Sequence, residues 1–233
     1  MTQVSDPADE TEDDEALPAH KPPARLLLIR HGVTEHTGPI LSGRLPGIDL
    51  SPEGVRQAQA TAARLAGVDI AAVYASPIER TAQTAAHIAA PHGLDVQTLP
   101  GVIEADYGEW TGGKIVDLAK TDEWKVVQVA PSRAAFPGGE SMRDMQARTV
   151  SALDEVMARH PNRNVVVVSH ADPIRSAIAH YVGMHLDLFQ RLAVAPASVT
   201  VLQFHEFGAQ LVKYSDTGAF DELLPPPPGD TDG

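Results

Sequence analysis

The sequence predicts an α/β fold in which helices cover both faces of a mainly parallel β-sheet, giving a three-layer αβα sandwich. Residues 26–29 and 165–168 are short, continuous apolar runs without alternating polar positions. Such runs are typical of strands that are buried on both faces of a parallel sheet. Helix-start signals separate the strand signals along the chain, which is the order expected of this class of fold. The sequence contains no internal repeat.

Local signals place two further strands and the first two helices. Residues 72–75 and 198–204 predict strands. Ser51 is followed by proline and then by apolar residues at helical spacing. This predicts a helix start, because serine caps a helix and proline fits its first turn. Residues 76–79 (Ser-Pro-Ile-Glu) match a capping box in which the serine is the cap.

Two more helices are expected in the second half of the chain. Residues 139–160 carry apolar side chains at helical spacing and are followed by a proline, which ends a helix. Glu140 and Ser141 are candidates for the N-terminal cap of this helix. Asp172, also followed by proline, predicts a helix that opens directly after the strand at 165–168.

The chain has 233 residues and a formal net charge of −13, and most of that charge lies near its ends. Residues 1–20 hold seven acids and no Lys or Arg, and residues 218–233 hold four acids, four consecutive prolines and no base. Segments of this composition bury too little apolar surface to offset chain entropy. We therefore expect a disordered acidic tail at 1–23, one folded domain at 24–217, and a disordered proline-rich acidic tail at 218–233.

Composition also excludes several classes of function. The acidic balance argues against a nucleic-acid-binding surface, which needs Lys and Arg. The chain has no cysteine, which removes disulfides, thiolate metal sites and thiol catalysis. The N-terminus lacks the basic and apolar regions of a signal peptide, and no apolar run approaches the roughly 18 residues of a membrane span. We expect a cytoplasmic protein without nucleic-acid or membrane partners.

Two of the predicted strands run directly into histidine. Arg30 and His31 follow the first strand, and His170 lies just beyond the valine-rich strand. Ligands bind to open α/β sheets at the carboxyl ends of the strands, and the helix N-terminus beside His170 favours an anion. Arg80, in the first turn of a predicted helix, can reach the same rim. These four side chains predict a locally positive, phosphate-binding pocket.

The same residues predict phosphoryl transfer. A neutral imidazole is a good nucleophile toward phosphorus, and a covalent intermediate divides one high barrier into two lower ones. The guanidinium groups of arginine stabilise the three equatorial oxygens of the transferred phosphoryl group through paired hydrogen bonds. The leaving alkoxide needs a proton. Glu104 is the leading candidate for its donor, because a nearby anionic substrate would raise its pKa; Asp106 and Glu109 lie close by in the sequence.

Seven segments carry recognisable motifs in a fixed order. They are 28–34 (LIRHGVT), 43–47 (GRLPG), 50–54 (LSPEG), 75–85 (ASPIERTAQTA), 104–112 (EADYGEWTG), 137–141 (PGGES) and 168–171 (VSHA). The first resembles the RHG-x-T signature of the histidine phosphatase, or phosphoglycerate mutase-like, superfamily, and the similarity extends across about 24–204. The resemblance implies the phosphoglycerate mutase-like form of the predicted sandwich.

The resemblance also implies roles for the pocket residues. It implies that His31 is phosphorylated during turnover and that Glu104 donates the proton. The phosphoryl group would be held by Arg30, Arg80 and His170. No metal or organic cofactor is implied, because arginine and histidine cations take the role that a metal would otherwise fill.

Five further positions are candidates for contact with phosphate or substrate, of which the resemblance implies Thr34 and Ala171. Thr34 offers its hydroxyl and Ala171 its backbone N–H. Ser42 and Gly43 are further candidates for contact with the substrate. At Thr37 the family often has an asparagine, and threonine can donate one hydrogen bond but lacks the amide's reach.

Three functions remain open from the sequence. The first is a metal-independent phosphatase that hydrolyses a small phosphorylated metabolite through phospho-His31. The second is a phosphoglycerate mutase-like phosphomutase that uses the same histidine. Segment 113–139 is short, whereas the family's mutases usually have a longer insertion there, which favours the phosphatase. The third is a non-catalytic module that binds a phosphorylated ligand. The oligomeric state is left open, a homodimer included.

Overall fold

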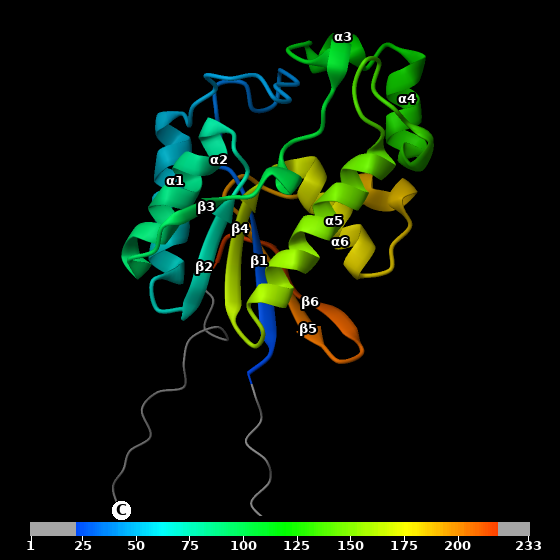
Figure 1. The fold of residues 1–233 in the computed structure, drawn as a ribbon. Helices are drawn as coiled ribbons and strands as arrows, with labels where there is room; N and C mark the ends of the chain where they lie inside the picture. Colours follow the sequence, from blue (N-terminus) through cyan, green and yellow to red (C-terminus); the bar gives the residue numbers. More distant parts are fainter. Residues whose placement is uncertain (1–21, 219–233) are drawn as a thin grey trace, which may run out of the picture.

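The computed structural model describes residues 22–218, which form a six-stranded sheet with helices on both faces (Figure 1). The strands are β1 (Ala24–Arg30), β2 (Ile70–Ala75), β3 (Val96–Thr98), β4 (Asn164–Ser169), β5 (Val199–His205) and β6 (Gly208–Asp216). The helices are α1 (Pro52–Leu65), α2 (Glu79–Ala89), α3 (Ile115–Leu118), α4 (Asp122–Val129), α5 (Met142–Arg159) and α6 (Ala171–Tyr181). Short 3₁₀ segments include Pro100–Val102, Gly108–Trp110 and Leu186–Arg191. The tail predictions for 1–21 and 219–233 lie outside the described residues.

Strands β4 and β1 lie at the centre of the sheet, whose order is β3-β2-β4-β1-β5-β6. Strands β3, β2, β4 and β1 are parallel to one another. Strand β5 runs antiparallel to β1, and β6 runs antiparallel to β5. The predicted mainly parallel sheet is therefore confirmed, with an antiparallel pair at one edge that the sequence analysis left unspecified.

The continuous apolar runs are explained by two cores, one on each face of the sheet. Alternate residues of β1 and β4 point to one face and pack with residues of α5 and α6: Leu26, Leu28, Val165 and Val167. The intervening residues point to the other face and pack with residues of α1 and α2: Leu27, Ile29, Val166 and Val168. These eight side chains are at most 1% exposed. Figure 1 shows the two helix pairs on opposite sides of the sheet.

Two of the predicted helix starts are confirmed by their caps. The Ser51 side chain accepts a hydrogen bond from the Gly54 N–H at 3.2 Å, and α1 begins at the following proline. The Ser141 side chain accepts one from the Asp144 N–H at 3.1 Å, so α5 begins at residue 142 rather than at 139. Glu140, the other candidate cap, has different partners that are described below.

Two predicted caps are wrong. Helix α2 has Ile78 at its cap position without a capping side chain, because the Ser76 hydroxyl lies 2.8 Å from His170 Nε2 instead. Helix α6 has His170 at its cap position. Asp172 therefore lies within the first turn, where its carboxylate accepts a hydrogen bond from the Tyr107 hydroxyl at 2.8 Å. Both polar side chains serve buried partners, which gain more from a hydrogen bond than an exposed helix end does.

Strands β3 and β6 were not predicted. Strand β3 has only three residues, and none of them is fully buried. Strand β6 forms the edge of the sheet and none of its nine residues is fully buried. Neither strand therefore needs the apolar run on which the sequence prediction of strands depended.

Shortening a buried side chain of the central sheet should destabilise the protein strongly. Leu27→Ala removes a fully buried side chain from β1, so we expect the free energy of unfolding to fall by about 2–5 kcal/mol. Urea unfolding followed by circular dichroism measures this change. The control is Phe207→Ala, since Phe207 is 96% exposed, and it should change the free energy by less than about 0.5 kcal/mol. Equal effects of both variants would contradict the described core.

Candidate active site

The predicted convergence of the two histidines is confirmed. Arg30, the last residue of β1, pairs with Ser169, the last residue of β4. The next residue of each strand therefore leaves the sheet at the same level, and the His31 N–H donates to the Ser169 carbonyl oxygen at 3.0 Å. The ring centroids of His31 and His170 lie 5.3 Å apart at an interplanar angle of 63°.

A cavity of about 310 Å³ opens at this end of the sheet. Nine of the ten predicted site residues line it: Arg30, His31, Thr34, Thr37, Ser42, Gly43, Arg80, Glu104 and Ala171. The tenth, His170, is fully buried and reaches the cavity through Arg80. Apolar side chains, among them Trp124, Val127 and Phe136, form part of the wall. The lining of the pocket is thus partly polar, at the predicted site residues, and partly apolar.

His31 is held as a neutral imidazole with a defined tautomer. Its Nδ1 lies 2.7 Å from the Gly32 carbonyl oxygen, which can only accept, so Nδ1 carries the proton. Its Nε2 accepts a hydrogen bond from Arg80 Nε at 3.2 Å. Burial, and then the charge of Arg80, lowers the pKa of His31 from 6.5 to about 3. The ring therefore presents an unprotonated Nε2 at neutral pH.

The backbone that follows His31 lies against the first turn of α1. A Cβ atom on Gly32 would lie 2.5 Å from the Gly54 carbonyl oxygen, and one on Gly54 would lie 2.1 Å from the Val33 carbonyl oxygen. Ser51 N–H also donates to the Val33 carbonyl oxygen at 3.0 Å. Only glycine allows this close approach, which fixes the backbone on which the His31 ring is carried.

Arg80 connects the two histidines, as the predicted positive pocket requires. It lies in the first turn of α2 and is 2% exposed. Its Nη2 donates to the Gly43 carbonyl oxygen at 2.8 Å and to His170 Nδ1 at 3.2 Å. Its Nη1 is buried without a hydrogen-bond partner among the described residues. The guanidinium thus has an unused donor beside His31.

His170 is the best-buried polar group of the site. Since Arg80 can only donate, His170 Nδ1 accepts, and its Nε2–H donates to the Ser76 hydroxyl at 2.8 Å. Burial, followed by the charge of Arg80, lowers the pKa of His170 well below 6.5. His170 is therefore a neutral group that orients Arg80. The expectation of histidine cations is thus wrong, because burial keeps both imidazoles neutral and leaves the positive charge to the arginines.

Arg30 supplies the second cation of the pocket. Its Nη1 donates to the Val194 carbonyl oxygen at 2.7 Å, which anchors the guanidinium to the segment before β5. Its Nε is buried and has no hydrogen-bond partner within residues 22–218. Together with Arg80, Arg30 gives the pocket two guanidinium groups with donors to spare.

Glu104 has the electrostatics expected of a proton donor. It is 7% exposed, and its Oε1 accepts a hydrogen bond from the Ala105 N–H at 2.9 Å. Burial, with the Asp172 charge adding to it, raises the pKa of Glu104 from 4.5 to about 7. Its Oε2 lies 4.0 Å from His170 Nδ1. A substantial fraction of Glu104 is therefore protonated at neutral pH, within the site.

The smaller predicted contacts also lie at the pocket. The hydroxyl oxygens of Thr34 and Thr37 are 3.1 Å apart, and the Thr34 N–H donates to Thr37 Oγ1 at 2.9 Å. Ser42 Oγ lies 3.2 Å from His36 Nδ1. Ala171 is the first residue of α6, so its N–H belongs to the helix N-terminus that faces the cavity.

Among the polar pocket residues that the sequence analysis did not identify as site residues, Tyr107, Asp172 and Arg175 are joined to one another. The Asp172 carboxylate accepts from the Tyr107 hydroxyl at 2.8 Å and from Arg175 Nη1 at 3.4 Å. All three residues line the cavity. Arg175 lies four residues after Ala171, one turn along the predicted helix, and that spacing could have identified it.

Residues 22–218 lack two features that would point to other kinds of function. No helix within residues 22–218 is long and apolar enough to cross a membrane. In the same residues, no three His, Cys, Asp or Glu side chains are grouped so as to hold a metal ion.

Comparison with known proteins gives a consistent result. A family model described as histidine phosphatase superfamily (branch 1) matches residues 26–217. Phosphoserine phosphatase 1 of Hydrogenobacter thermophilus is 32% identical over 198 residues, which cover 83% of this chain and 92% of that protein. A 2,3-bisphosphoglycerate-dependent phosphoglycerate mutase of Thermoplasma acidophilum is 33% identical, over 76% of this chain and 85% of that protein. Among solved structures, a mycobacterial glucosyl-3-phosphoglycerate phosphatase has a TM-score of 0.76 at 26% identity, covering 83% of this chain and 99% of that one.

The fold and these similarities place the chain among the phosphoric monoester hydrolases. It belongs to the histidine phosphatase superfamily, branch 1. The family resemblance that the motifs indicated is thus confirmed.

The raised pKa of Glu104 should make stability depend on pH. The folded state holds this proton more tightly than the unfolded state, so wild type loses stability as pH rises from about 4.5 to about 7. Glu104→Gln cannot ionise and lacks this loss. Between pH 5 and pH 8, we expect the free energy of unfolding of the wild type to fall by on the order of 3 kcal/mol relative to that of this variant. Urea unfolding at both pH values measures the difference, and a constant difference would contradict the raised pKa.

Proposed function

We propose that the chain is a metal-independent phosphatase that hydrolyses a small phosphomonoester through a phosphohistidine at His31. The observation that carries this proposal is the state of His31: a neutral ring with its proton on Nδ1 and its Nε2 lone pair beside Arg80 Nε, at 3.2 Å. A nucleophile toward phosphorus needs such a lone pair, and the transferred group needs nearby cations.

In the first step, the Nε2 lone pair of His31 forms a bond to phosphorus while the bond from phosphorus to the ester oxygen breaks. The bound phosphoryl group takes over the donors of Arg80 and Arg30, including the buried, unpartnered Nη1 and Nε atoms. Phosphorylation makes the His31 ring cationic, and the Gly32 carbonyl oxygen stabilises that charge through the Nδ1 proton. Glu104 donates its proton to the departing alkoxide.

In the second step, water attacks the phosphohistidine. The Glu104 carboxylate takes a proton from that water while the water oxygen forms a bond to phosphorus. The bond from phosphorus to His31 Nε2 breaks at the same time. Inorganic phosphate leaves, and both His31 and Glu104 return to their starting states. A pKa of about 7 for Glu104 suits a group that gives a proton in one step and accepts one in the other.

The nucleophile is tested with p-nitrophenyl phosphate. We expect His31→Ala to lower the rate of phosphate release by at least about 1000-fold, since it removes the covalent route. Wild type should keep its activity in EDTA. The control is His205→Ala, because the exposed His205 lies at the end of β5, away from the cavity, and it should be as active as wild type. Full activity of the His31 variant would refute the proposal, and loss of wild-type activity in EDTA would refute metal independence.

The intermediate is tested separately by rapid acid-free quench and phosphate analysis of the protein. Wild type incubated with p-nitrophenyl phosphate should carry an acid-labile, base-stable phosphoryl group, and His31→Ala should carry none. An unlabelled wild type that turns over rapidly would mean that no phosphohistidine accumulates, which contradicts the expected label. An unlabelled and inactive wild type would favour a module that only binds a phosphorylated ligand.

A phosphomutase is the second candidate, because one relative at 33% identity is a 2,3-bisphosphoglycerate-dependent phosphoglycerate mutase. A mutase must keep water out until the phosphoryl group has returned to an organic acceptor. We expect wild type given 3-phosphoglycerate and a bisphosphate primer to release inorganic phosphate faster than it forms 2-phosphoglycerate. The opposite order of rates would reverse the assignment.

A further inference from the structure

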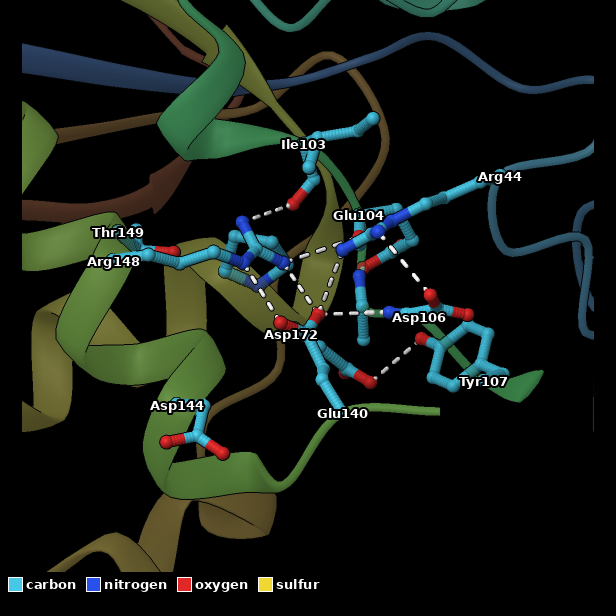
Figure 2. Close-up of polar contacts among 12 residues, drawn as sticks. Arg44, Ile103, Glu104, Asp106, Tyr107, Glu140, Asp144, Arg148, Thr149 and Asp172 are labelled. Carbon is cyan, nitrogen blue, oxygen red and sulfur yellow. Dashed lines mark hydrogen bonds and ion pairs between the residues drawn. The ribbon is translucent and has the colours of Figure 1, made fainter. Parts of the chain in front are cut away.

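Glu104 lies in an irregular stretch, residues 103–107, between the 3₁₀ segments Pro100–Val102 and Gly108–Trp110. A loop is a poor support for a proton donor, which must be held within about 0.5 Å of its working position. Helix hydrogen bonds reach only the two ends of this stretch, at the Ile103 N–H and the Tyr107 carbonyl oxygen, and leave residues 104–106 without helix or strand bonds. Its support comes from three side chains that the proposed chemistry does not use, Arg44, Glu140 and Arg148 (Figure 2).

Arg148, on α5, reaches three carbonyl groups around the proton donor. Its Nη1 donates to the carbonyl oxygens of Gly101 and Ile103, both at 2.8 Å. Its Nη2 donates to the carbonyl oxygen of Glu104 at 3.2 Å. One guanidinium from a rigid helix thus binds the backbone both before and at residue 104.

Arg44 reaches the same carbonyl group from the other side, as Figure 2 shows. Its Nε donates to the Glu104 carbonyl oxygen at 2.8 Å. The residue before it, Gly43, accepts the hydrogen bond from Arg80 Nη2. The segment that carries Arg44 therefore touches the backbone of the proton donor and the cation beside the nucleophile.

Glu140 joins the two arginines. Its Oε1 accepts from Arg148 Nη2 at 2.6 Å and from Arg44 Nη2 at 3.0 Å, and its Oε2 accepts from Arg148 Nε at 2.9 Å. Oε1 also accepts from the Asp106 N–H at 2.8 Å, while the Glu140 N–H donates to the Asp106 carbonyl oxygen at 3.0 Å. The backbone is thus held two residues beyond Glu104 as well as at it.

The charges of this cluster are balanced. The Asp106 carboxylate lies 3.3 Å from Arg44 Nη1, so two acids face two arginines. Burial, the largest single effect, acts to raise the pKa of Glu140. The hydrogen bonds from Arg148 and the Asp106 N–H, together with the charges of Arg148 and Arg44, outweigh it and hold that pKa below its ordinary value. Glu140 is therefore ionised while it bridges. The cluster can bind the backbone of Glu104 without adding a net positive charge beside its carboxyl group.

We propose that Arg44, Glu140 and Arg148 form a clamp that positions Glu104 for proton donation to the leaving group. These are positioning residues, since none of them is placed against the reacting atoms. The inference rests on the proposed function, because it assumes that Glu104 is the proton donor. It explains why two of the matched motifs, 43–47 and 137–141, contain an arginine and a glutamate that have no part in holding the phosphoryl group.

The clamp is tested with two aryl phosphates whose leaving groups differ in basicity, each variant being compared with wild type on the same substrate. Phenyl phosphate has a basic leaving group that needs a proton donor, whereas 2,4-dinitrophenyl phosphate has one that does not. For Glu140→Gln we expect kcat/KM for phenyl phosphate to fall at least about tenfold, with less than about a threefold change for 2,4-dinitrophenyl phosphate. Arg148→Lys should show the same difference, or split, between the two substrates, because lysine keeps the positive charge but lacks the several fixed donors of the guanidinium group.

Two further variants complete the experiment. Glu104→Gln gives the reference pattern for loss of the proton donor. Arg159→Met removes an exposed arginine, paired with Glu155, from the same helix, and should leave both substrates unaffected. Thermal unfolding shows which variants are folded. If Glu140→Gln or Arg148→Lys does not fold, Arg44→Met is used in its place, because Arg44 is the most exposed member of the clamp.

The outcomes separate the clamp from the proposed function. Equal losses on both substrates, or no loss in folded clamp variants while Glu104→Gln shows the split, would overturn the clamp alone. If Glu104→Gln shows no split, Glu104 is not the proton donor and the clamp's role falls with it. If His31→Ala keeps full activity, the proposed function fails whatever the clamp variants do.

Discussion

The site depends on the in-register pairing of β1 with β4. Arg30 stands opposite Ser169, so the following residues, His31 and His170, emerge together at the carboxyl end of the sheet. The pairing is firmly specified because both faces of both strands are buried. A slip of one residue would turn each apolar side chain toward the wrong core and would separate the two imidazole rings. The two cores therefore determine the geometry of the candidate active site as well as the stability of the domain.

Burial also sets the protonation states within the pocket. The same desolvation lowers the pKa of His31 and raises that of Glu104, so that one group is a free base and the other is partly an acid at the same pH. The guanidinium groups keep their charge under these conditions. A chain with a net charge of −13 thus encloses a pocket in which the cations of Arg30 and Arg80 lie beside His31. The overall charge gives no measure of the field that a bound phosphate ester meets.

Much of this arrangement could be predicted from the sequence, because buried parallel strands and their carboxyl ends have strong local signals. The predictions failed where a side chain chooses between a local and a distant partner. Ser76 and Asp172 have the sequence context of helix caps, yet they bind His170 and Tyr107. Arg148 could not be linked to Glu104 from the sequence, since the contact depends on how α5 packs beside the loop. Local rules describe short-range alternatives, and tertiary contacts decide between them.

The contact between Gly32 and Gly54 has a consequence for how the chain can change. Each glycine faces a backbone atom of the other segment at a distance that admits no side chain. A substitution at either position cannot be absorbed by repacking, because the obstacle is main chain, so it must push α1 away from the loop that carries His31. Sequence variation at the start of α1, on the opposite face of the sheet from α5, is therefore constrained by the loop that carries His31.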